Sequence, residues 1–253
     1  FEDGVEQKID RLLPAAMPFN VALMLDTSGS TTFTHEQIQQ SALKFVEILI
    51  PEDRVMIVSF DLRVYLDSEF TADRDQLHRA ILQTHLGAST RLYDAVELVV
   101  ADRLVQIPER KAIVLFSDGV DNASRLVGAW ETLSTVQESN VLVYAIQYDS
   151  AAAPQGRYYS KSAYADVTQY LEALTSESGG RSFQAKTLKS LDAAFSMIAD
   201  ELRQQYTICY YPSRPANDGS FRRIQVFVDA PEVRIRARKG YRAGRAVAHA
   251  GIP

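Results

Sequence analysis

The stretch VALMLDTSGS, residues 21–30, indicates the fold of this protein. An unbroken apolar run ends in Asp26 and is followed by small polar residues. Apolar runs of this length are typical of strands that are buried on both faces of a parallel sheet. The polar residues after such a strand lie at its carboxyl end, which is the edge where α/β sheets bind their ligands.

Three similar strands and several amphipathic helices follow along the chain. The strand-like runs are RVMIVSF, AIVLF and VLVYAIQ at residues 54–60, 112–116 and 141–147. Between them apolar residues recur at helical spacing, most regularly over Leu188–Leu202. Strands that alternate with helices predict an α/β fold: a Rossmann-like, doubly wound, mostly parallel sheet with helices on both faces, over residues 19–205.

Several local features add detail to this region. Arg63–Phe70 alternates between polar and apolar residues and predicts an edge strand. Asp73 is placed to cap the next helix. We expect a helix from about Ser124 to Glu138, with the single tryptophan, Trp130, packed in the core. Residues 149–164 have no clear period and predict a long loop.

The two ends of the chain differ from this pattern. Residues 1–18 contain a turn signal, Asp3-Gly4, and are predicted to form an N-terminal β segment. Residues 206–253 hold strand-like stretches without helices between them, at 206–211, 222–228 and 233–239. We expect strands from both ends to pair in one small antiparallel β-element. In the last stretch apolar residues alternate with arginines, which predicts one buried face and one basic face.

Charge is divided unevenly along the chain. The whole sequence carries 27 Lys+Arg against 32 Asp+Glu, a net charge of −5. From Arg203 to the end there are ten basic residues and three acidic ones, so this part carries +7 and the remainder −12. Two interpretations remain open: the basic face balances the acidic body, or it binds an acidic partner or an anionic surface. The acidic overall charge argues against nucleic-acid binding.

Composition excludes several other classes of protein. A hydrophobic fraction of 46% is too high for a disordered chain. The longest apolar runs have the length of strands and are too short for a transmembrane helix. The first residues lack the basic and apolar regions of a signal peptide. Cys209 is the single cysteine, so the chain has no internal disulfide and no metal site built from several cysteines.

Oxygen-bearing side chains gather at the predicted carboxyl ends of the strands. Asp26, Ser28 and Ser30 follow the first buried strand. Thr90 precedes a helix, and Asp118 follows the third buried strand. Such hard ligands suit a hard cation, Mg²⁺ first and Mn²⁺ or Ca²⁺ next. Turn formation and helix capping are the structural alternative for these residue types.

These three segments resemble a von Willebrand factor A-type domain. VALMLDTSGS at 21–30, GASTRLYDAV at 87–96 and KAIVLFSDGVDN at 111–122 look like the three segments of that family's metal-ion-dependent adhesion site. The resemblance implies that Ser28, Ser30 and sometimes Thr90 touch the ion, and that the aspartates act largely through bound waters. It implies five metal residues in all: Asp26, Ser28, Ser30, Thr90 and Asp118. Ser89 stands where the family usually has a second glycine, which puts the shape of that loop in doubt.

The flanking segments carry a further resemblance. FEDGVEQKI at 1–9, LRQQYTICYYP at 202–212 and VRIRARKGY at 233–241 look like a bacterial subfamily of secreted proteins related to von Willebrand factor A domains. In that subfamily, FEDG-type segments end an N-terminal β-domain. The resemblance therefore implies an extracytoplasmic protein, secreted, periplasmic or at the cell surface, whose signal peptide is absent from this chain.

The predicted ligand set suggests a binding function rather than an enzymatic one. A cation held mostly by neutral hydroxyls and water keeps positive charge and an exchangeable coordination position. The hypothesis is an adhesion or interaction module whose protein partner supplies an Asp or Glu carboxylate. Rim residues would set its specificity, and the candidates are Thr31, Thr32, Phe33, His35 and Arg91.

Two alternatives stay open beside this hypothesis. A metal-dependent hydrolase would need a base near the ion, yet the four histidines are scattered: His35, His78, His85 and His249. The sequence also lacks a nucleophile elbow and a phosphate-binding loop. The other alternative is a scaffold that binds an acidic partner through the basic C-terminal β-element.

Overall fold

The computed structural model describes residues 1–13, 17–29, 33–148, 161–214, 218–230, 232–233 and 235–243, and for residues 161–167 it describes the backbone alone. Its main sheet has the strand order β4-β3-β2-β5-β6-β7, and every pair is parallel except β3–β4. The strands are β2 (Asn20–Asp26), β3 (Arg54–Phe60), β4 (Val64–Thr71), β5 (Lys111–Ser117), β6 (Leu142–Tyr148) and β7 (Arg181–Ala185).

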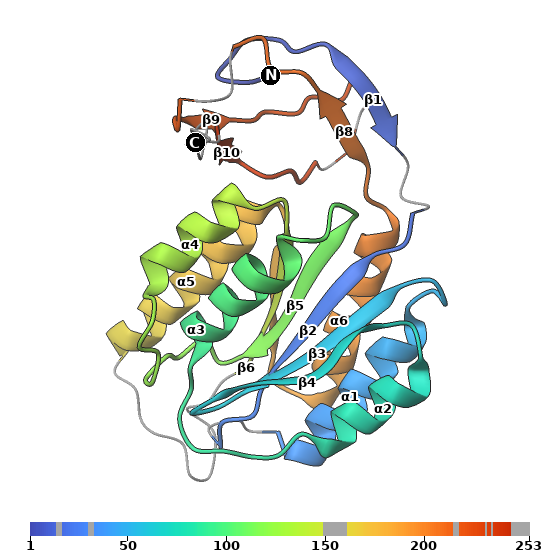
Figure 1. Ribbon diagram of the computed structural model, residues 1–253, viewed down its shortest axis with the longest axis vertical. Coiled ribbons are helices and arrows are strands. Elements are labelled where there is room, and N and C mark those ends of the chain that lie inside the picture. The colour runs from blue at the N-terminus through green and yellow to red at the C-terminus, as the bar shows by residue number, and fades with distance from the viewer. Residues whose placement is uncertain are drawn as a thin grey trace, which may run out of the picture.

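Helices cover both faces of this sheet (Figure 1). One face carries α1 (His35–Ile48), α2 (Arg74–Gln83) and α6 (Leu188–Arg203). The other carries α3 (Leu92–Glu97), its π-helical continuation η1 (Leu98–Leu104), α4 (Ala129–Glu138) and α5 (Lys161–Ser178). The predicted α/β fold, a doubly wound and mostly parallel sheet between two helical layers, is confirmed.

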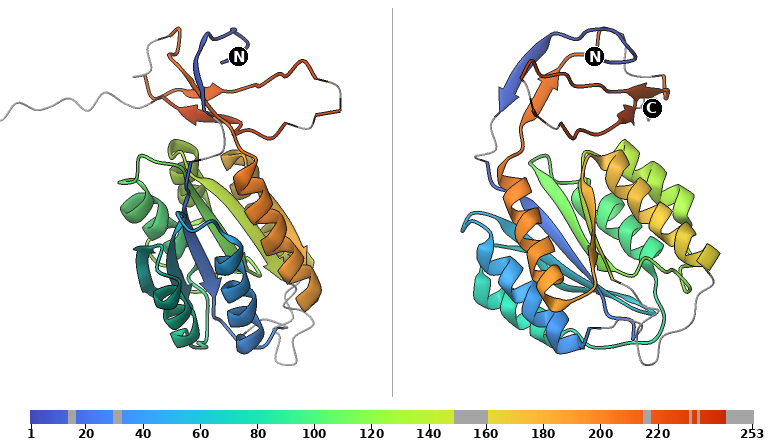
Figure 2. Two further views of the ribbon diagram at one scale, coloured as in Figure 1. Left: turned by 90° about the vertical axis from the view of Figure 1, so that its right-hand side faces the viewer. Right: turned by 180° about the vertical axis from the view of Figure 1, so that it is seen from behind.

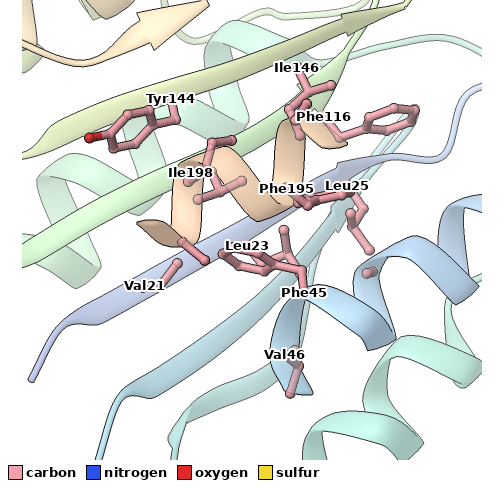
Figure 3. Packing of buried hydrophobic residues seen from close by; sticks show 14 of the residues in the cluster. Val21, Leu23, Leu25, Phe45, Val46, Phe116, Tyr144, Ile146, Phe195 and Ile198 are labelled. Atoms are coloured by element: carbon pink, nitrogen blue, oxygen red, sulfur yellow. The ribbon is translucent and has the colours of Figure 1, made fainter. Parts of the chain in front are cut away.

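Strand β2 lies at the centre of both hydrophobic layers. Leu23 and Leu25 pack in one layer with Phe45 of α1 and Phe195 of α6, whose rings are 5.1 Å apart (Figure 3). Met24 points into the opposite layer. A strand with both faces buried needs apolar residues at every position, because successive side chains point to opposite sides. This explains the unbroken apolar run that precedes Asp26.

Several local predictions agree with the structure. Strand β4 is the antiparallel edge strand that the alternation of residues 63–70 predicts. Asp73 caps α2, since its carboxylate accepts a hydrogen bond from Gln76 N at 3.0 Å. Gly179 ends α5 with a φ of 88°, a conformation that glycine adopts without strain. Of the loop predicted at 149–164, residues 149–160 lie outside the described part of the chain. Residues 161–164 belong to α5 rather than to a loop.

The prediction for Trp130 is wrong. Helix α4 begins at Ala129 rather than near Ser124, and its buried positions are Thr132 and Val136. Trp130 lies roughly opposite these positions on the helix. Its side chain is therefore turned away from the sheet, and the residue is 75% exposed.

The two chain ends form the small antiparallel β-element that the sequence predicts. Strand β1 (Ile9–Leu13) pairs with β8 (Thr207–Tyr210), and β9 (Phe221–Arg223) pairs with β10 (Gly240–Arg242). Glu2 forms a further bridge with Ile224. Figures 1 and 2 show these strands together at one end of the molecule, beyond the amino end of β2.

A buried glutamate links the two ends of the chain. Glu2 Oε2 accepts hydrogen bonds from the hydroxyls of Tyr210 and Tyr241, both at 2.8 Å. The guanidinium of Arg222, also buried, lies 3.8 Å from Glu2 Oε1. Burial and the bond to Glu2 raise the pKa of Tyr210 and Tyr241, so both phenols stay protonated as donors. The FEDG-type segment is thus fastened to the C-terminal strands by one carboxylate.

The strand predicted at 233–239 is wrong. Regular pairing begins only at Gly240, and Val233 and Ile235 are exposed rather than buried. Basic side chains that follow Ile235 turn toward the α/β unit instead. Arg236 pairs with Glu201 at 2.6 Å and Lys239 with Glu177 at 2.9 Å.

These basic residues meet the carboxyl ends of helices. Arg238 Nη2 donates to Gln137 O near the end of α4 at 2.7 Å, and Arg242 lies 3.7 Å from Glu138. Glu177 and Glu201 belong to the last turns of α5 and α6. The carboxyl end of a helix carries a partial negative charge, which favours nearby cations. The basic residues of the C-terminal part therefore contact acids and helix ends of the acidic α/β part.

We predict that Glu2→Gln loosens the β-element. The change removes the charge of the carboxylate that accepts from Tyr210 and Tyr241 and lies 3.8 Å from Arg222, which keeps its pairing with Asp218 at 2.8 Å. Hydrogen bonds to a charged group contribute about 2 kcal/mol, so we expect a loss of this size. Hydrogen exchange should quicken in strands β1 and β8 while the main sheet stays protected. Glu6→Gln, at an exposed position, is the control. Unchanged exchange in β1 and β8 would show that Glu2 does not hold the β-element together.

Candidate metal centre

The candidate site lies where the strand order of the main sheet reverses. From β2, the chain continues to β3 on one side, and β5 lies on the other side. Asp26 ends β2, and Asp118 directly follows β5. Both side chains belong to residues with no exposed surface. The carboxyl ends of two neighbouring strands thus bring two acids to the crevice where doubly wound sheets bind ligands.

Hydrogen bonds fix both oxygens of Asp26. Oδ1 accepts from Ser28 N at 3.0 Å, and Oδ2 accepts from Ser117 Oγ at 2.7 Å. Ser117 Oγ in turn accepts from Gly119 N at 2.9 Å, and Asp118 Oδ1 accepts from Val120 N at 2.9 Å. The first and third predicted segments are therefore joined through Asp26. Sequence reasoning missed Ser117, although it directly precedes Asp118.

The loop after β2 pairs with the middle predicted segment. Gly29 N donates to Gly87 O at 3.2 Å, and Gly87 N donates to Thr27 O at 2.9 Å. A Cβ on Gly87 would lie 1.6 Å from Asp61 Oδ2, so only glycine fits here. Asp61 also accepts from Arg91 N through its backbone oxygen, at 2.9 Å. Asp61 is therefore a positioning residue that the sequence did not indicate.

Thr90 is held between two loops. Asn122 Oδ1 accepts from Thr90 N at 2.9 Å, and Thr90 O accepts from Asn122 N and Ala123 N at 3.1 and 3.0 Å. These bonds tie the second predicted segment to the third. Before Thr90, Ser89 has a φ of 112°, in the region that favours glycine. The loop therefore keeps a backbone that glycine adopts easily, with serine in its place.

A further buried acid, Asp94, fixes the loop after β5. Asp94 accepts hydrogen bonds from the backbone nitrogens of Arg125, Leu126 and Val127 at 3.0 to 3.3 Å. Asp121 fastens the start of the same loop, since its Oδ2 accepts from Tyr93 N at 3.0 Å. Both acids accept backbone hydrogen bonds between α3 and the loop after β5, so they anchor that loop to α3.

The acids beneath the site favour a bound cation. Burial, and next the charge of Asp118, raise the pKa of Asp26, while its hydrogen bonds to Ser117 and Ser28 lower it. Two buried carboxylates that repel each other are relieved by a cation. With Ser28 and Thr90 the donor set is all oxygen, which fits Mg²⁺. Within the described ranges there is no cluster of three or more His, Cys, Asp or Glu able to hold a metal, so a cation here would also need hydroxyl ligands.

The predicted site residues have different outcomes. Asp26, Ser28, Thr90 and Asp118 are buried and linked through the three loops. Ser30 and the rim candidates Thr31 and Thr32 lie outside the described residues.

The other rim candidates lie in the described part of the chain. Phe33 is a correction: it is buried in the core, where its ring lies 6.1 Å from that of Phe116, because α1 needs an apolar residue just before its first turn. His35 Nε2 lies 2.7 Å from Thr84 O and links α1 to α2. Arg91 is partly exposed and lies 3.7 Å from Asp94.

We predict that Ser89→Gly stabilises the protein. Glycine removes the strain of the positive φ, and its greater freedom in the unfolded chain offsets part of the gain, which leaves about 1 kcal/mol. Urea unfolding measures the change. Ser213→Gly, at an exposed position outside the set of positive-φ residues, should lose stability instead. A loss in both variants would contradict the strain at Ser89.

We also predict opposite effects of Asp26→Asn with and without Mg²⁺. The folded protein holds the proton of Asp26 to a higher pH than the unfolded chain does, so metal-free stability falls as pH rises above about 4. In EDTA the variant should lack this pH dependence and melt at or above the wild-type temperature at neutral pH. Mg²⁺ should raise the Tm of the wild type and of the Asp75→Asn control, but not of Asp26→Asn. An equal Mg²⁺ response in all three would exclude Asp26 from the metal centre.

Comparisons with known proteins bear on the family and the fold. Residues 21–120 match the family model described as the von Willebrand factor type A domain. Among curated proteins no match to the sequence is found. In the described part of the chain no helix is both long and apolar enough to cross a membrane.

Solved structures share the fold at low sequence identity. One is the von Willebrand factor type A protein from Catenulispora acidiphila, with TM-score 0.57, 12% identity, and coverage of 74% of this chain and 42% of that one. Another is the vWF domain of the type V pili tip protein Mfa5 from Porphyromonas gingivalis, with TM-score 0.58, 15% identity, and coverage of 73% and 95%.

A third is the pilus adhesin SpaC from Lactobacillus rhamnosus GG in its open conformation, with TM-score 0.58, 13% identity, and coverage of 76% and 30%. The chain thus spans less than half of the first and third of these proteins and nearly all of the second. Residues 21–120 thus match the von Willebrand factor type A domain family, and the sheet with its two helical layers has the fold of these solved structures.

Proposed function

We propose that this protein is a metal-dependent interaction module. A divalent cation, Mg²⁺ or else Mn²⁺ or Ca²⁺, is held at the carboxyl ends of β2 and β5 and accepts an Asp or Glu carboxylate from a partner protein. The residues that hold the cation are Asp26, Ser28, Ser30, Thr90 and Asp118.

One observation carries this proposal: Asp26 and Asp118 are buried side by side at the strand ends, with hydroxyl residues around them. Such a pair is costly in a protein interior without a cation. The fold is shared with a pili tip protein and a pilus adhesin, which supports an interaction role at the level of the domain.

The residues of this chain have distinct tasks in the proposed site. Ser117 and the backbone of Ser28 orient the carboxylate of Asp26. Asn122 fixes the loop that presents Thr90. When bound, the cation supplies a positive charge with an exchangeable position for a carboxylate. Because this set contains few negative charges, the site attracts an anionic group from a partner.

The hydrolase alternative gains no specific support. His78 pairs with Glu47 at 2.6 Å between α1 and α2, and the ring of His85 packs against Tyr65. His35 is engaged with Thr84, and His249 lies outside the described residues. The basic C-terminal residues contact acids and helix ends of the same chain, which favours the interpretation that they balance the acidic body.

The site of action is part of the proposal. The segments that resemble secreted bacterial proteins form the β-element around Glu2, and two of the solved structures with this fold are pilus proteins. We therefore place the protein outside the cytoplasm, in the periplasm, at the cell surface or secreted.

A selection from a displayed random-peptide library tests the binding function. Peptides are captured on the immobilised protein in MgCl₂ and released with EDTA. We expect the released peptides to be enriched in Asp and Glu, and capture to fail on Asp26→Ala. Asp75→Ala, which removes an exposed acid of α2, should capture as the wild type does. Equal capture in EDTA, or by Asp26→Ala, would refute metal-dependent binding.

A further inference from the structure

Two large apolar side chains in the segment that follows Asp118 are exposed to solvent. Leu126 is 82% exposed and Trp130 is 75% exposed, although tryptophan is mostly buried in proteins. Both belong to the segment between β5 and the first turn of α4. Exposed apolar residues of this size, rimmed by polar ones, mark binding surfaces.

This segment is continuous with the candidate metal centre. Thr90 accepts hydrogen bonds from Asn122 and Ala123, and Asp94 accepts from Arg125 and Leu126. Hydrogen bonds thus connect the segment that contains Leu126 to Thr90, a predicted metal residue, and to Asp94 of α3, and Trp130 follows at the start of α4. The segment that carries both apolar side chains therefore adjoins the loop that presents Thr90.

The backbone beneath these side chains is fixed. Asp94 holds three successive amides of the loop, and Glu131 accepts from Gly128 N at 3.1 Å at the start of α4. A rigid backbone with exposed side chains loses little entropy when it binds a partner. Tryptophan rings also supply large contact area with few rotatable bonds. The geometry therefore favours a preorganised contact surface.

The charge around the pair indicates the partner. Arg125 is exposed, and Arg91 is partly exposed next to Thr90. Glu131 is the exposed acid of this segment and already caps Gly128. Asp94 pairs with Arg91 and, like Asp121, accepts hydrogen bonds from the backbone, so Arg125 and a bound cation are the charges of this face that suit an acidic segment.

We propose that Leu126 and Trp130 form a second contact point of the site, which binds an apolar side chain next to the carboxylate that the metal accepts. The partner is an acidic protein segment in which Asp or Glu lies close to a leucine or an aromatic residue. This inference rests on the proposed metal-dependent function and names the partner class of that site. Arg125 stabilises the acidic segment between the two contact points.

Trp130 offers a direct measurement because it is the only tryptophan in the chain. The probes are synthetic peptides with one Asp in a Gly/Ser background and a Leu at successive positions on either side. In MgCl₂ the peptides with a suitably placed Leu should shift the Trp130 emission to shorter wavelength and protect it from acrylamide quenching. The reference peptide with Asp alone should leave the emission unchanged.

Affinities of fluorescein-labelled peptides, measured by polarisation, separate the two contact points. The double variant Leu126→Ser, Trp130→Ser should lose about tenfold in affinity for the Leu-containing peptides and keep the weak affinity for the Asp-only peptide. Val105→Ser, which removes an exposed apolar side chain beyond η1, should bind as the wild type does. Asp26→Ala or EDTA should abolish both affinities.

Each other outcome contradicts a stated claim. Mg²⁺-dependent binding with no preference for Leu-containing peptides, or an undiminished preference in the double variant, overturns the second contact point and leaves the metal-dependent function intact. Binding that survives EDTA but not the double variant overturns both. Absence of peptide binding, or self-association that the double variant abolishes in analytical ultracentrifugation, overturns the acidic partner.

Discussion

The position of Asp26 between two strand ends is the constraint on which the site depends. Its carboxylate accepts from Ser28 on the loop after β2 and from Ser117 at the end of β5. These bonds hold a buried charge near that of Asp118, and that arrangement raises its pKa. The strand that ends in Asp26, β2, is buried throughout and contributes side chains to both hydrophobic layers. A buried acidic pair at a strand switch point is therefore maintained at a cost that a cation would remove.

The opposite end of the molecule is held by charge in a different way. Arg236, Arg238 and Lys239 contact acids or carbonyl oxygens at the last turns of three helices. Parallel α/β units gather helix carboxyl ends at one edge, so that edge is negative and attracts a basic segment. Glu2 then fastens the first residues to the same strands. The candidate site thus lies at the carboxyl ends of β2 and β5, and the β-element that joins the chain termini lies at the opposite end of the sheet.

The sequence predicted the main sheet well because both-face burial leaves an unmistakable apolar run. It also predicted Asp26, Ser28, Thr90 and Asp118 as one group, and the structure links their loops. The sequence did not predict the exposure of side chains whose surroundings depend on tertiary contacts. Trp130 was expected in the core but turns to solvent, since the loop held by Asp94 delays the start of α4. The segment at 233–239 alternates like a strand, yet Arg236, Arg238 and Lys239 contact the carboxyl ends of helices.

The sequence by itself therefore determined three local features. They are the apolar runs that form buried strands, the residues that cap helices, and the oxygen-bearing residues that follow the strands. Only the tertiary structure decided which other side chains position those candidate ligands and the loops that carry them. Each positioning residue is far in sequence from the group that it contacts: Asp61 from Gly87, Ser117 from Asp26, and Asp94 from the loop at 125–127. Their roles arise from close approach between loops, and an aspartate or serine carries no local pattern that reveals which distant backbone it will meet.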